Sequence, residues 1–428
     1  MSDISFKEAL KFWVKLGFIN FGGPAGQIAI MHREIVDARK WISESAFMSA
    51  LNFCMLLPGP EAHQLATYIG WKLHGYKGGI AAGVFFVLPS VFVMLLLSWI
   101  AVAHTDVPAI SGFFYGITPV VVAIVAEAVI RIGKKALTHT SLYFFAAMSF
   151  IAGQFFPVPF PAIVFVAGAA GLLMGKRYEK VFCFRGHGSK ECLMAEPEFS
   201  QTKLPSLWHP VKMAFIFIII WSAVILPLIF SKGFGDILAQ QAVFFTKAAF
   251  VTFGGAYAVL SYISDHAVMV LGWLTESQML MGLGLAESTP GPLIMVTQYV
   301  GFLGAWKFSG ASNPLAYGIA GGILTTFVTF LPSFFFIFSC APYIELISSN
   351  KRIQAALIGI TAAVVGVILK LAVFFSIKTF FPNDGFDVFA IVMAIISFIA
   401  IMRFHLSIHL VIFLGALTGM LYKLLIVI

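Results

Sequence analysis

Charged residues are scarce in this sequence. Asp, Glu, Lys and Arg together make up 11% of its 428 residues, whereas a soluble domain carries about 25%. Hydrophobic residues make up 60%, and the mean hydropathy is +0.95. Apolar runs long enough to cross a hydrocarbon core of about 30 Å recur at 79–100, 211–229, 316–338 and 356–375. The composition therefore excludes a large soluble domain and predicts an all-α polytopic membrane protein.

Motifs of common enzymes and metal sites are also missing. The chain contains neither His-Glu-x-x-His nor Gly-x-Gly-x-x-Gly, the signatures of a zinc protease and of a dinucleotide site. Of the four cysteines, Cys54 and Cys340 lie in apolar segments. Cys183, His187 and Cys192 lie close together, but their spacing lacks a fourth ligand and differs from that of zinc motifs. We therefore predict no enzymatic activity, no cofactor and no metal site.

The chain instead contains an internal repeat. The motif Phe21-Gly22-Gly23 recurs as Phe253-Gly254-Gly255, an offset of 253 − 21 = 232 residues. The same offset relates Pro58-Gly59-Pro60 to Pro290-Gly291-Pro292. Such collinear matches indicate a duplication. We predict two tandem homologous halves, at 1–175 and 236–428, joined by a basic linker at 176–212 and an extra membrane helix at 213–235.

The charges of the two halves predict opposite orientations in the membrane. Lys and Arg in short loops favour the cytoplasmic side. The first half carries Arg33, Arg39 and Lys40 after its Phe-Gly-Gly motif, whereas the matching stretch 256–272 carries Asp265 and neither Lys nor Arg. The basic linker is predicted to be cytoplasmic, as is the N-terminus. Inverted repeats are typical of secondary transporters, which bind their substrate between the repeats.

Both repeated motifs are predicted to break helices within the membrane. Two prolines around a glycine cannot continue a helix, and broken backbone persists in a membrane only where protein or a water-filled cavity covers it. The first turn of a half-helix offers free N–H groups and a partial positive charge, which suit an oxyanion. The alternative is that the breaks are only kinks or packing sites of crossing helices.

The candidate site residues are these motifs and the polar residues beside them. Candidates for binding the anion are Lys15, Asn20, Gly22, Gly23, Gln27, Asn52, Pro58, Gly59, Pro60, Glu61, Gln64, Lys247, Gly254, Gly255, Ser288, Thr289, Pro290, Gly291, Pro292 and Gln298. Ionisable side chains inside a membrane are functional by default, so candidates for proton coupling are Glu61, His63, Glu127 and Glu287.

Several of these candidates also have a structural interpretation. Lys15 and Lys247 occupy matching positions, where they could neutralise a dianion or extend to the membrane surface. Glu61 and His63 could instead cap a helix or lie at the interface. Glu127 could pair with Arg131, four residues further along a helix, and Arg131 itself is interpreted as a cytoplasmic charge.

The motifs resemble those of the chromate ion transporter family. The resemblance rests on Phe21-Gly22-Gly23-Pro24-Ala25-Gly26-Gln27, on Trp41-Ile42-Ser43 and on Asn52 to Ala62 around Pro58-Gly59-Pro60-Glu61. It is nearly continuous over 21–99, and the second half resembles the C-terminal half of the long, two-domain form. The resemblance implies chromate efflux, resistance to chromate and inverted halves. The linker with Cys183 and Cys192 is not part of it.

The sequence thus predicts a secondary transporter that exports chromate across the cytoplasmic (inner) membrane, driven by the membrane potential, by proton exchange or by both. A dianion leaving a negative interior gains twice the roughly 2.3 kcal/mol per charge that 100 mV supplies. Sulfate is the alternative substrate, since both ions are tetrahedral dianions. A channel and an intramembrane enzyme are weaker alternatives. The expected partners are the oxyanion and the lipid bilayer, without nucleic acid, in a monomer or a homodimer.

Overall fold

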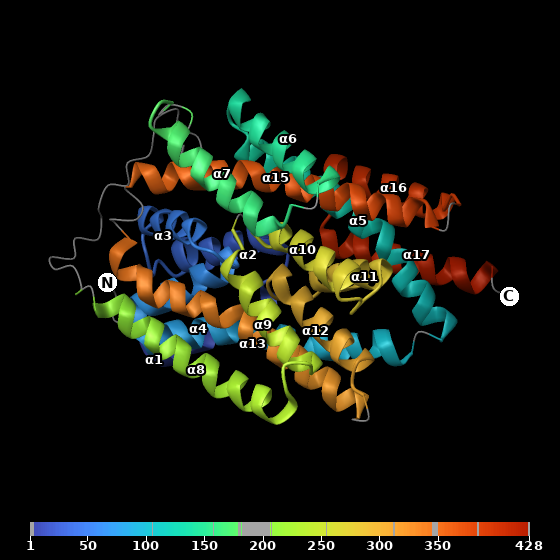
Figure 1. Cartoon of the computed structure of the whole chain (residues 1–428), viewed down its shortest axis with the longest axis horizontal. Helices are drawn as coiled ribbons and strands as arrows, with labels where there is room; N and C mark the ends of the chain where they lie inside the picture. Colours follow the sequence, from blue (N-terminus) through green and yellow to red (C-terminus); the bar gives the residue numbers. More distant parts are fainter. Residues whose placement is uncertain are drawn as a thin grey trace.

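The computed structural model describes residues 4–104, 106–156, 158–178, 181, 206, 208–253, 255–310, 313–344, 350–382 and 385–426. Cys183, His187, Cys192 and Gly254 lie outside the described residues. Within them the chain forms helices and no strand (Figure 1). The predicted all-α fold is therefore confirmed, while the inverted orientation of the halves stays a prediction.

The first half contains seven α-helices in the described part of the chain. They are α1 (Phe6–Ile19), α2 (Gly23–His32) followed by the π-helical turn η1 (Arg33–Ala38), α3 (Glu44–Leu56), α4 (Glu61–Ala103), α5 (Pro108–Ala136), α6 (Thr140–Phe155) and α7 (Phe160–Gly175). A separate helix, α8 (Trp208–Lys232), precedes the second half.

The second half repeats this order of helices. It contains α9 (Ile237–Phe250), α10 (Ala256–Ser264) followed by η2 (Asp265–Val270), α11 (Glu276–Ser288), η3 (Leu293–Met295) continuing into α12 (Val296–Lys307), α13 (Pro314–Cys340) followed by η4 (Ala341–Tyr343), α15 (Lys351–Phe380), α16 (Val388–Phe404) and α17 (Ile408–Ile426). Both ends of α3 and α11, and of η1 and η2, are related by the sequence offset of 232. Helices also end before each Phe-Gly-Gly and each Pro-Gly-Pro, so the predicted breaks are confirmed.

Helix α4 reverses direction within its length. His74 and Gly75 have non-helical backbone angles, with φ of +61° at Gly75. Gly70 and Gly78 then pack so closely that a Cβ added to Gly70 would lie 2.4 Å from the Gly78 carbonyl oxygen. The two arms of α4 therefore correspond to α12 and α13, which form a similar pair in the second half. The first arm, like α3, is too short to cross a membrane alone.

The two halves exchange their last helices. Helices α6 and α7 of the first half pack on α15 of the second, while α16 and α17 of the second half pack on α5 of the first (Figure 1). Glycines allow the close approach: Gly116 of α5 lies against Gly415 of α17, and Gly359 of α15 lies against Gly171 of α7. Since Gly116 and Gly359 are equivalent positions of the repeat, the exchange is reciprocal and interlocks the halves.

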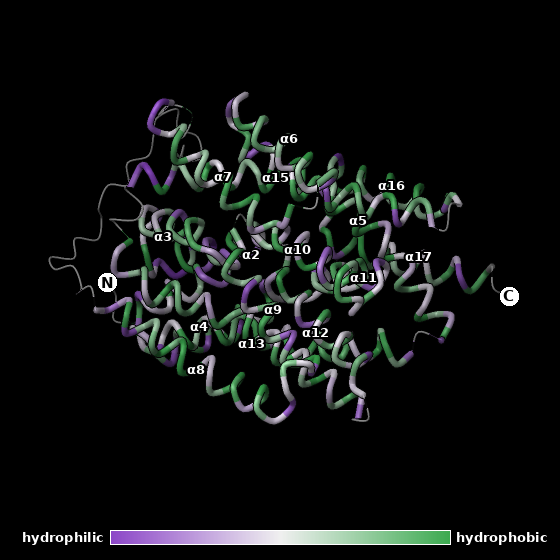
Figure 2. Tube along the Cα trace, in the orientation of Figure 1, coloured by the Kyte–Doolittle hydropathy of each residue, from purple (hydrophilic) through white to green (hydrophobic). Residues whose placement is uncertain are grey.

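Six helices of the described residues are long and apolar enough to cross a membrane, by length and composition. They are Glu61–Ala103, Pro108–Ala136, Trp208–Lys232, Pro314–Tyr343, Lys351–Phe380 and Ile408–Leu425. All four apolar runs noted in the sequence fall inside them. Apolar positions run along these helices, and hydrophilic ones gather at ends such as those of α7 and α15 (Figure 2). The protein is therefore a multi-pass membrane protein.

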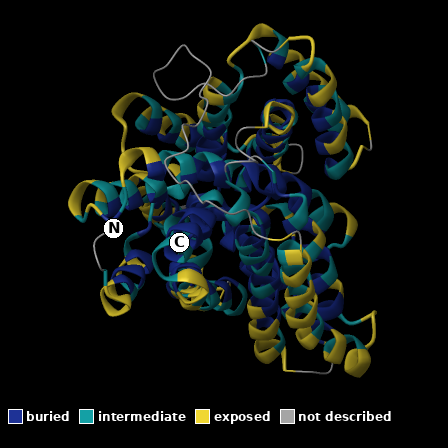
Figure 3. Cartoon of the chain, turned by 90° about the vertical axis from the view of Figure 1, so that its left-hand side faces the viewer, coloured by how far each residue is buried: buried dark blue, intermediate teal, exposed yellow. Residues whose placement is uncertain are grey.

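Helix α8 lies at the edge of the molecule (Figure 1), and exposed residues lie along the outer helices and loops (Figure 3). Ile225 is its one buried residue in the described structure. It is attached through the Trp221 indole, which donates to Thr246 Oγ1 at 2.9 Å. An apolar, exposed helix of this length suits a lipid-facing position.

Candidate functional site

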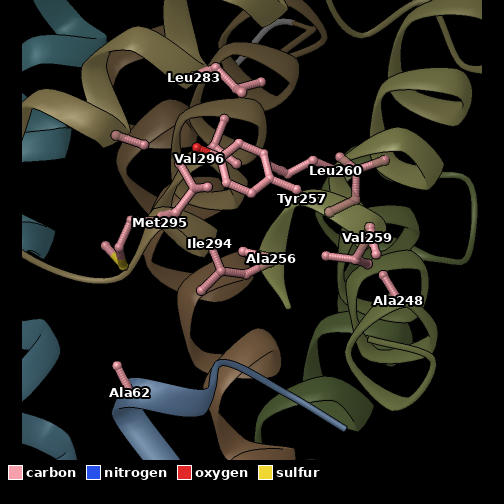
Figure 4. Packing of buried hydrophobic residues seen from close by; sticks show 14 of the residues in the cluster. Ala62, Ala248, Ala256, Tyr257, Val259, Leu260, Leu283, Ile294, Met295 and Val296 are labelled. Carbon is pink, nitrogen blue, oxygen red and sulfur yellow. The ribbon is translucent and has the colours of Figure 1, made fainter. Parts of the chain in front are cut away.

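A small cavity lies between the two halves, at the point where the broken helices meet. Its lining comes from both halves: Pro24, Gln27, Pro60, Glu61 and Ala62 from the first, and Gly255, Ala256, Pro292, Leu293 and Ile294 from the second. Ala256 and Ile294 lie close together, with Ala62 below them in the view (Figure 4). Pro60 and Pro292 are equivalent positions of the repeat, as are Pro24 and Ala256. The cavity is thus built from matching segments of the two halves.

The cavity is closed in this conformation. Its free volume is about 10 Å³, room for about one water molecule. A tetrahedral oxyanion has five heavy atoms and needs more space than this. The structure therefore corresponds to a closed state of the cavity, and a ligand of that size requires the surrounding helices to move apart.

Four helices begin at the cavity. These are α2 at Gly23, α4 at Glu61, α10 at Ala256, and η3 at Leu293, which continues into α12. The first N–H groups of a helix have no partner within the helix, and they carry the positive end of its dipole. Four such N-termini around one cavity are an arrangement that favours an anion over a cation.

These four N-termini lack the side-chain caps found on most of the other described helices. The residues that precede them (Gly22, Pro60, Gly255 and Pro292) make no side-chain capping bond in the described structure. Eight described helices that begin away from the cavity are capped by Ser5, Ser43, His139, Asp236, Thr275, Asn313, Asn350 and Asp387, while α5 and α7 also lack a side-chain cap. A cap occupies N–H groups that a ligand would otherwise bind. Its absence leaves those donors at the cavity available.

Two reciprocal backbone bonds close the cavity between the halves. The Gly59 N–H donates to the Thr252 carbonyl at 2.8 Å, and the Gly291 N–H donates to the Asn20 carbonyl at 3.2 Å. Gly59 and Gly291 are equivalent positions of the repeat, as are Asn20 and Thr252. Each Pro-Gly-Pro motif therefore binds the segment just before the Phe-Gly-Gly motif of the other half.

Gln27 strengthens the contact between Gly291 and Asn20. Its Nε2 donates to the Asn20 carbonyl at 3.0 Å and to the Gly291 carbonyl at 2.5 Å. Asn20 Nδ2 in turn donates to the Phe86 carbonyl at 3.0 Å. Both side chains are fully buried, and Gln27 Oε1 and Asn20 Oδ1 have no hydrogen-bond partner among the described residues. Gln27 thus connects the first Phe-Gly-Gly region to the second Pro-Gly-Pro motif.

Two carboxyl groups flank the cavity, one from each half. Glu61 lines it directly. Glu287, 3% exposed, accepts a hydrogen bond from the Tyr257 hydroxyl. A Cβ added to Gly255 would lie 3.8 Å from Glu61 Oε1, and one added to Gly23 would lie 3.9 Å from Glu287 Oε2. Each carboxyl group therefore reaches the Phe-Gly-Gly glycines of the other half.

Other predicted residues lie outside the cavity lining. Lys15 pairs with Glu34 at 3.1 Å and its side chain is 52% exposed, and Lys247 is exposed. His63 is fully buried among Phe86, Phe330 and Phe334. The structure therefore does not bring either lysine, or the histidine ring, to the cavity.

The remaining polar candidates make local contacts. Gln64 Nε2 donates to the Pro58 carbonyl at 2.7 Å, and Gln298 Nε2 donates to the Val91 carbonyl at 2.8 Å. The Ser288 and Thr289 hydroxyls donate to carbonyls of their own helix, and Asn52 is half-buried on α3. Gln64 thereby supports the first Pro-Gly-Pro turn, and Gln298 connects α12 to α4.

Sequence analysis did not single out Tyr257. This residue lies four positions after Phe253, in the first turn of α10, and its side chain is turned towards Leu283 and Val296 (Figure 4). The available signal in the sequence was a tyrosine that follows the Phe253-Gly254-Gly255 motif by two residues. Among the described residues, no cluster of His, Cys, Asp and Glu could hold a metal ion.

Comparison with known proteins agrees with the duplication. The family model described as "Chromate transporter" matches the chain twice, at 7–172 and 239–420. A chromate transport protein of Pseudomonas aeruginosa is 30% identical over 85% of this chain and 80% of its own length. A probable chromate transport protein of Synechococcus elongatus is 27% identical (85% and 83%), and a chromate transport protein of Cupriavidus metallidurans is 28% identical (85% and 81%).

No solved structure matches the chain. The family model covers both halves, including all four break motifs and the residues that line the cavity. The chain therefore belongs to the chromate transporter family.

Proposed function

We propose that this transporter exports chromate from the cell and so confers resistance to it. The observation that carries the proposal is the convergence of four uncapped helix N-termini on one cavity between the halves. Backbone N–H groups bind a tetrahedral oxyanion without sequestering it in a permanent ion pair. The names of the relatives support chromate as the oxyanion.

The direction and driving force follow from the charge of the substrate. A dianion leaving a negative interior gains about 4.6 kcal/mol per 100 mV, twice the value for one charge, so the membrane potential is sufficient for export. Proton exchange through Glu61 or Glu287 would add to it. The cavity lacks a nucleophile–base pair among the described residues, and transport without chemical conversion is the function we propose.

The proposed setting is the inner membrane, with inverted halves and with the N-terminus and the linker at 176–212 in the cytoplasm. The Lys and Arg bias of the loops supports this orientation. One chain already contains both sides of the cavity, so a monomer provides a complete site, and a homodimer would contain two.

The test is radiolabelled chromate flux in proteoliposomes at a clamped potential, with and without excess sulfate. Chromate flux that persists in sulfate is expected. Flux abolished by sulfate would make the protein a general oxyanion carrier, and absence of chromate flux would refute the proposal.

A matched pair of variants connects the flux to the cavity. Ala62 lines the cavity and is 2% exposed, so Ala62→Val fills the remaining space and should abolish flux. The same substitution at Ala147, which is exposed on α6, should leave flux unchanged. Equal flux in both variants would show that this cavity is not on the transport route.

A further inference from the structure

Two carboxyl groups of the protein lie beside helix N-termini that suit an anion. Gly23 begins α2 and Gly255 directly precedes α10, and neither N-terminus has a side-chain cap. Glu287 Oε2 lies 3.9 Å from a Cβ added to Gly23, and Glu61 Oε1 lies 3.8 Å from a Cβ added to Gly255. Each carboxyl group therefore faces the positive end of a broken helix of the other half, where negative charge is stabilised.

The duplication does not account for this symmetric placement. Gly23 and Gly255 are equivalent positions of the repeat, but the offset of 232 relates Glu61 to Leu293 and Glu287 to Met55. The two carboxyl groups thus come from positions that are not equivalent, and yet they reach equivalent glycines. We conclude that the carboxyl groups were not copied with the rest of each half.

The junctions between the halves explain how Glu61 reaches the second half. The Gly59 N–H donates to the Thr252 carbonyl at 2.8 Å. Glu61 follows Gly59 by two residues, and Gly255 follows Thr252 by three, so the junction sets the carboxyl group beside the start of α10. The reciprocal junction, from Gly291 to the Asn20 carbonyl at 3.2 Å, does the same for Glu287 and α2.

The two carboxyl groups differ in how firmly they are held. Glu287 is 3% exposed and accepts a hydrogen bond from the Tyr257 hydroxyl. Glu61 lines the cavity, is half-buried, and makes no side-chain hydrogen bond or ion pair with the described residues. The repeat position that corresponds to Tyr257 is Ala25, which has no hydroxyl to offer. Glu61 is therefore the carboxyl group that can leave its place.

A carboxylate and a dianion cannot share the N-terminus of α10. They repel each other, most strongly where the dielectric constant is low, and the free volume of about 10 Å³ has room for about one water molecule. We propose that the Glu61 carboxylate occupies this anion position while the cavity is closed, and that the tetrahedral oxyanion replaces it when the cavity opens. Tyr257 keeps Glu287 in the matching position at α2. Glu61 is thus an internal competitor of the substrate, an inference that rests on the proposed function.

The first experiment measures the Kd of chromate for detergent-purified protein by equilibrium dialysis. Glu61→Gln keeps the shape of the side chain and removes its charge. The Kd should fall about tenfold, because an anion at a partly buried helix N-terminus gains a factor of this order. Glu287→Gln is the matched control: it removes the same charge from the matching position and should change the Kd much less. The thermal stability of each variant is measured in parallel.

The second experiment reads the carboxyl group itself. Infrared difference spectra are recorded while membranes that contain the protein are perfused with chromate. The wild type should show a carboxylate band, because Glu61 changes its surroundings when the anion enters. The band should be lost in Glu61→Gln and kept in Glu287→Gln. A Glu61 side chain that only caps α4 would give no band.

Tyr257→Phe tests what holds the other carboxyl group. The substitution keeps the ring and removes the hydroxyl, so Glu287 loses its hydrogen-bond donor and should exchange as well. A second carboxylate band is expected, and adding Glu287→Gln should remove it. Absence of a second band in Tyr257→Phe would overturn the role of Tyr257.

The exchange at Glu61 is overturned if chromate binds without a carboxylate band, or if Glu61→Gln and Glu287→Gln shift the Kd equally. Failure of the proposed function is a different result. Chromate that binds with the expected band but does not cross the vesicle membrane refutes transport alone. Binding of sulfate without chromate refutes the substrate alone, and the same spectra recorded with sulfate then test the exchange. Absence of binding for both ions refutes both proposals.

Discussion

Alanine at the centre of either Pro-Gly-Pro motif should disable the protein. Gly59 and Gly291 have φ of +131° and +118°, where a side chain is strained. A Cβ on Gly59 would also lie 2.6 Å from Gln64 Nε2 and 2.9 Å from Ser333 Oγ, and one on Gly291 would lie 2.6 Å from Ser90 Cβ. Alanine at either glycine would therefore suffer both backbone strain and steric overlap.

The magnitude follows from these two effects. Backbone strain of this kind costs about 1–3 kcal/mol, and forcing a methyl group into a packed site costs about 1–3 kcal/mol more. Each variant should therefore lose about 2–6 kcal/mol of stability in the closed state, and the N–H bonds to Thr252 and Asn20 should lengthen. Because the two sites are equivalent positions of the repeat, the two losses should be similar in size.

The assay combines thermal unfolding of detergent-purified protein with chromate flux. Gly272→Ala is the control, since Gly272 has a positive φ of +58° but nothing within 4 Å of an added Cβ; it should lose only about 1–2 kcal/mol. Wild-type stability and flux in both Gly59→Ala and Gly291→Ala would refute the reasoning. A loss at one motif alone would contradict the equivalence of the two junctions.

Three other predictions concern topology, coupling and packing. Single cysteines at Ala38 and Met269, both exposed, should react with impermeant reagents from opposite faces in a cysteine-free background; labelling from one face would exclude inverted halves. Glu61→Gln should flatten the pH dependence of flux while chromate still binds, and an unchanged pH profile would remove Glu61 from proton coupling. Gly116→Ala and Gly359→Ala should each lower the unfolding temperature. Their Cβ atoms would lie 2.1 and 2.6 Å from carbonyl oxygens of α17 and α7, and overpacking of this kind costs about 1–3 kcal/mol. Gly153→Ala, with a nearest contact of 3.4 Å, should not lower the unfolding temperature.

The helix breaks could be predicted because they depend on local chemistry. Proline and glycine act on the backbone where they occur, so the ends of α1, α3, α9 and α11 follow from the sequence motifs. The repeat predicts equivalent positions in the same way. The reversal at His74–Gly75 was not predicted. Glycine is common in membrane helices, so a single glycine in an apolar stretch does not indicate that the helix reverses there.

The positions of Lys15 and Lys247 show why distance along the chain is a poor guide to a site. Lys15 lies six residues before Phe21, yet the buried face of α1 is made by Phe12, Trp13 and Leu16, so its side chain projects outwards. That periodicity was present in the sequence and outweighs the repeated position. Tyr257 was missed for the opposite reason: its hydroxyl acquires a role only through Glu287, thirty residues away.

The exchange of helices restricts how the cavity can open. Separating the halves would expose the contacts of α5 with α16 and α17 and of α15 with α6 and α7, and buried apolar and glycine-packed interfaces of this kind do not deform gradually. Opening at the Pro-Gly-Pro motifs instead breaks three hydrogen bonds between the halves, from the Gly59 and Gly291 N–H groups and from Gln27 Nε2 to the Gly291 carbonyl, each with a net contribution of about 1 kcal/mol. The lower-energy movement is therefore that of the broken helices α2, α4, α10 and α12 against a fixed frame of α5 and α15.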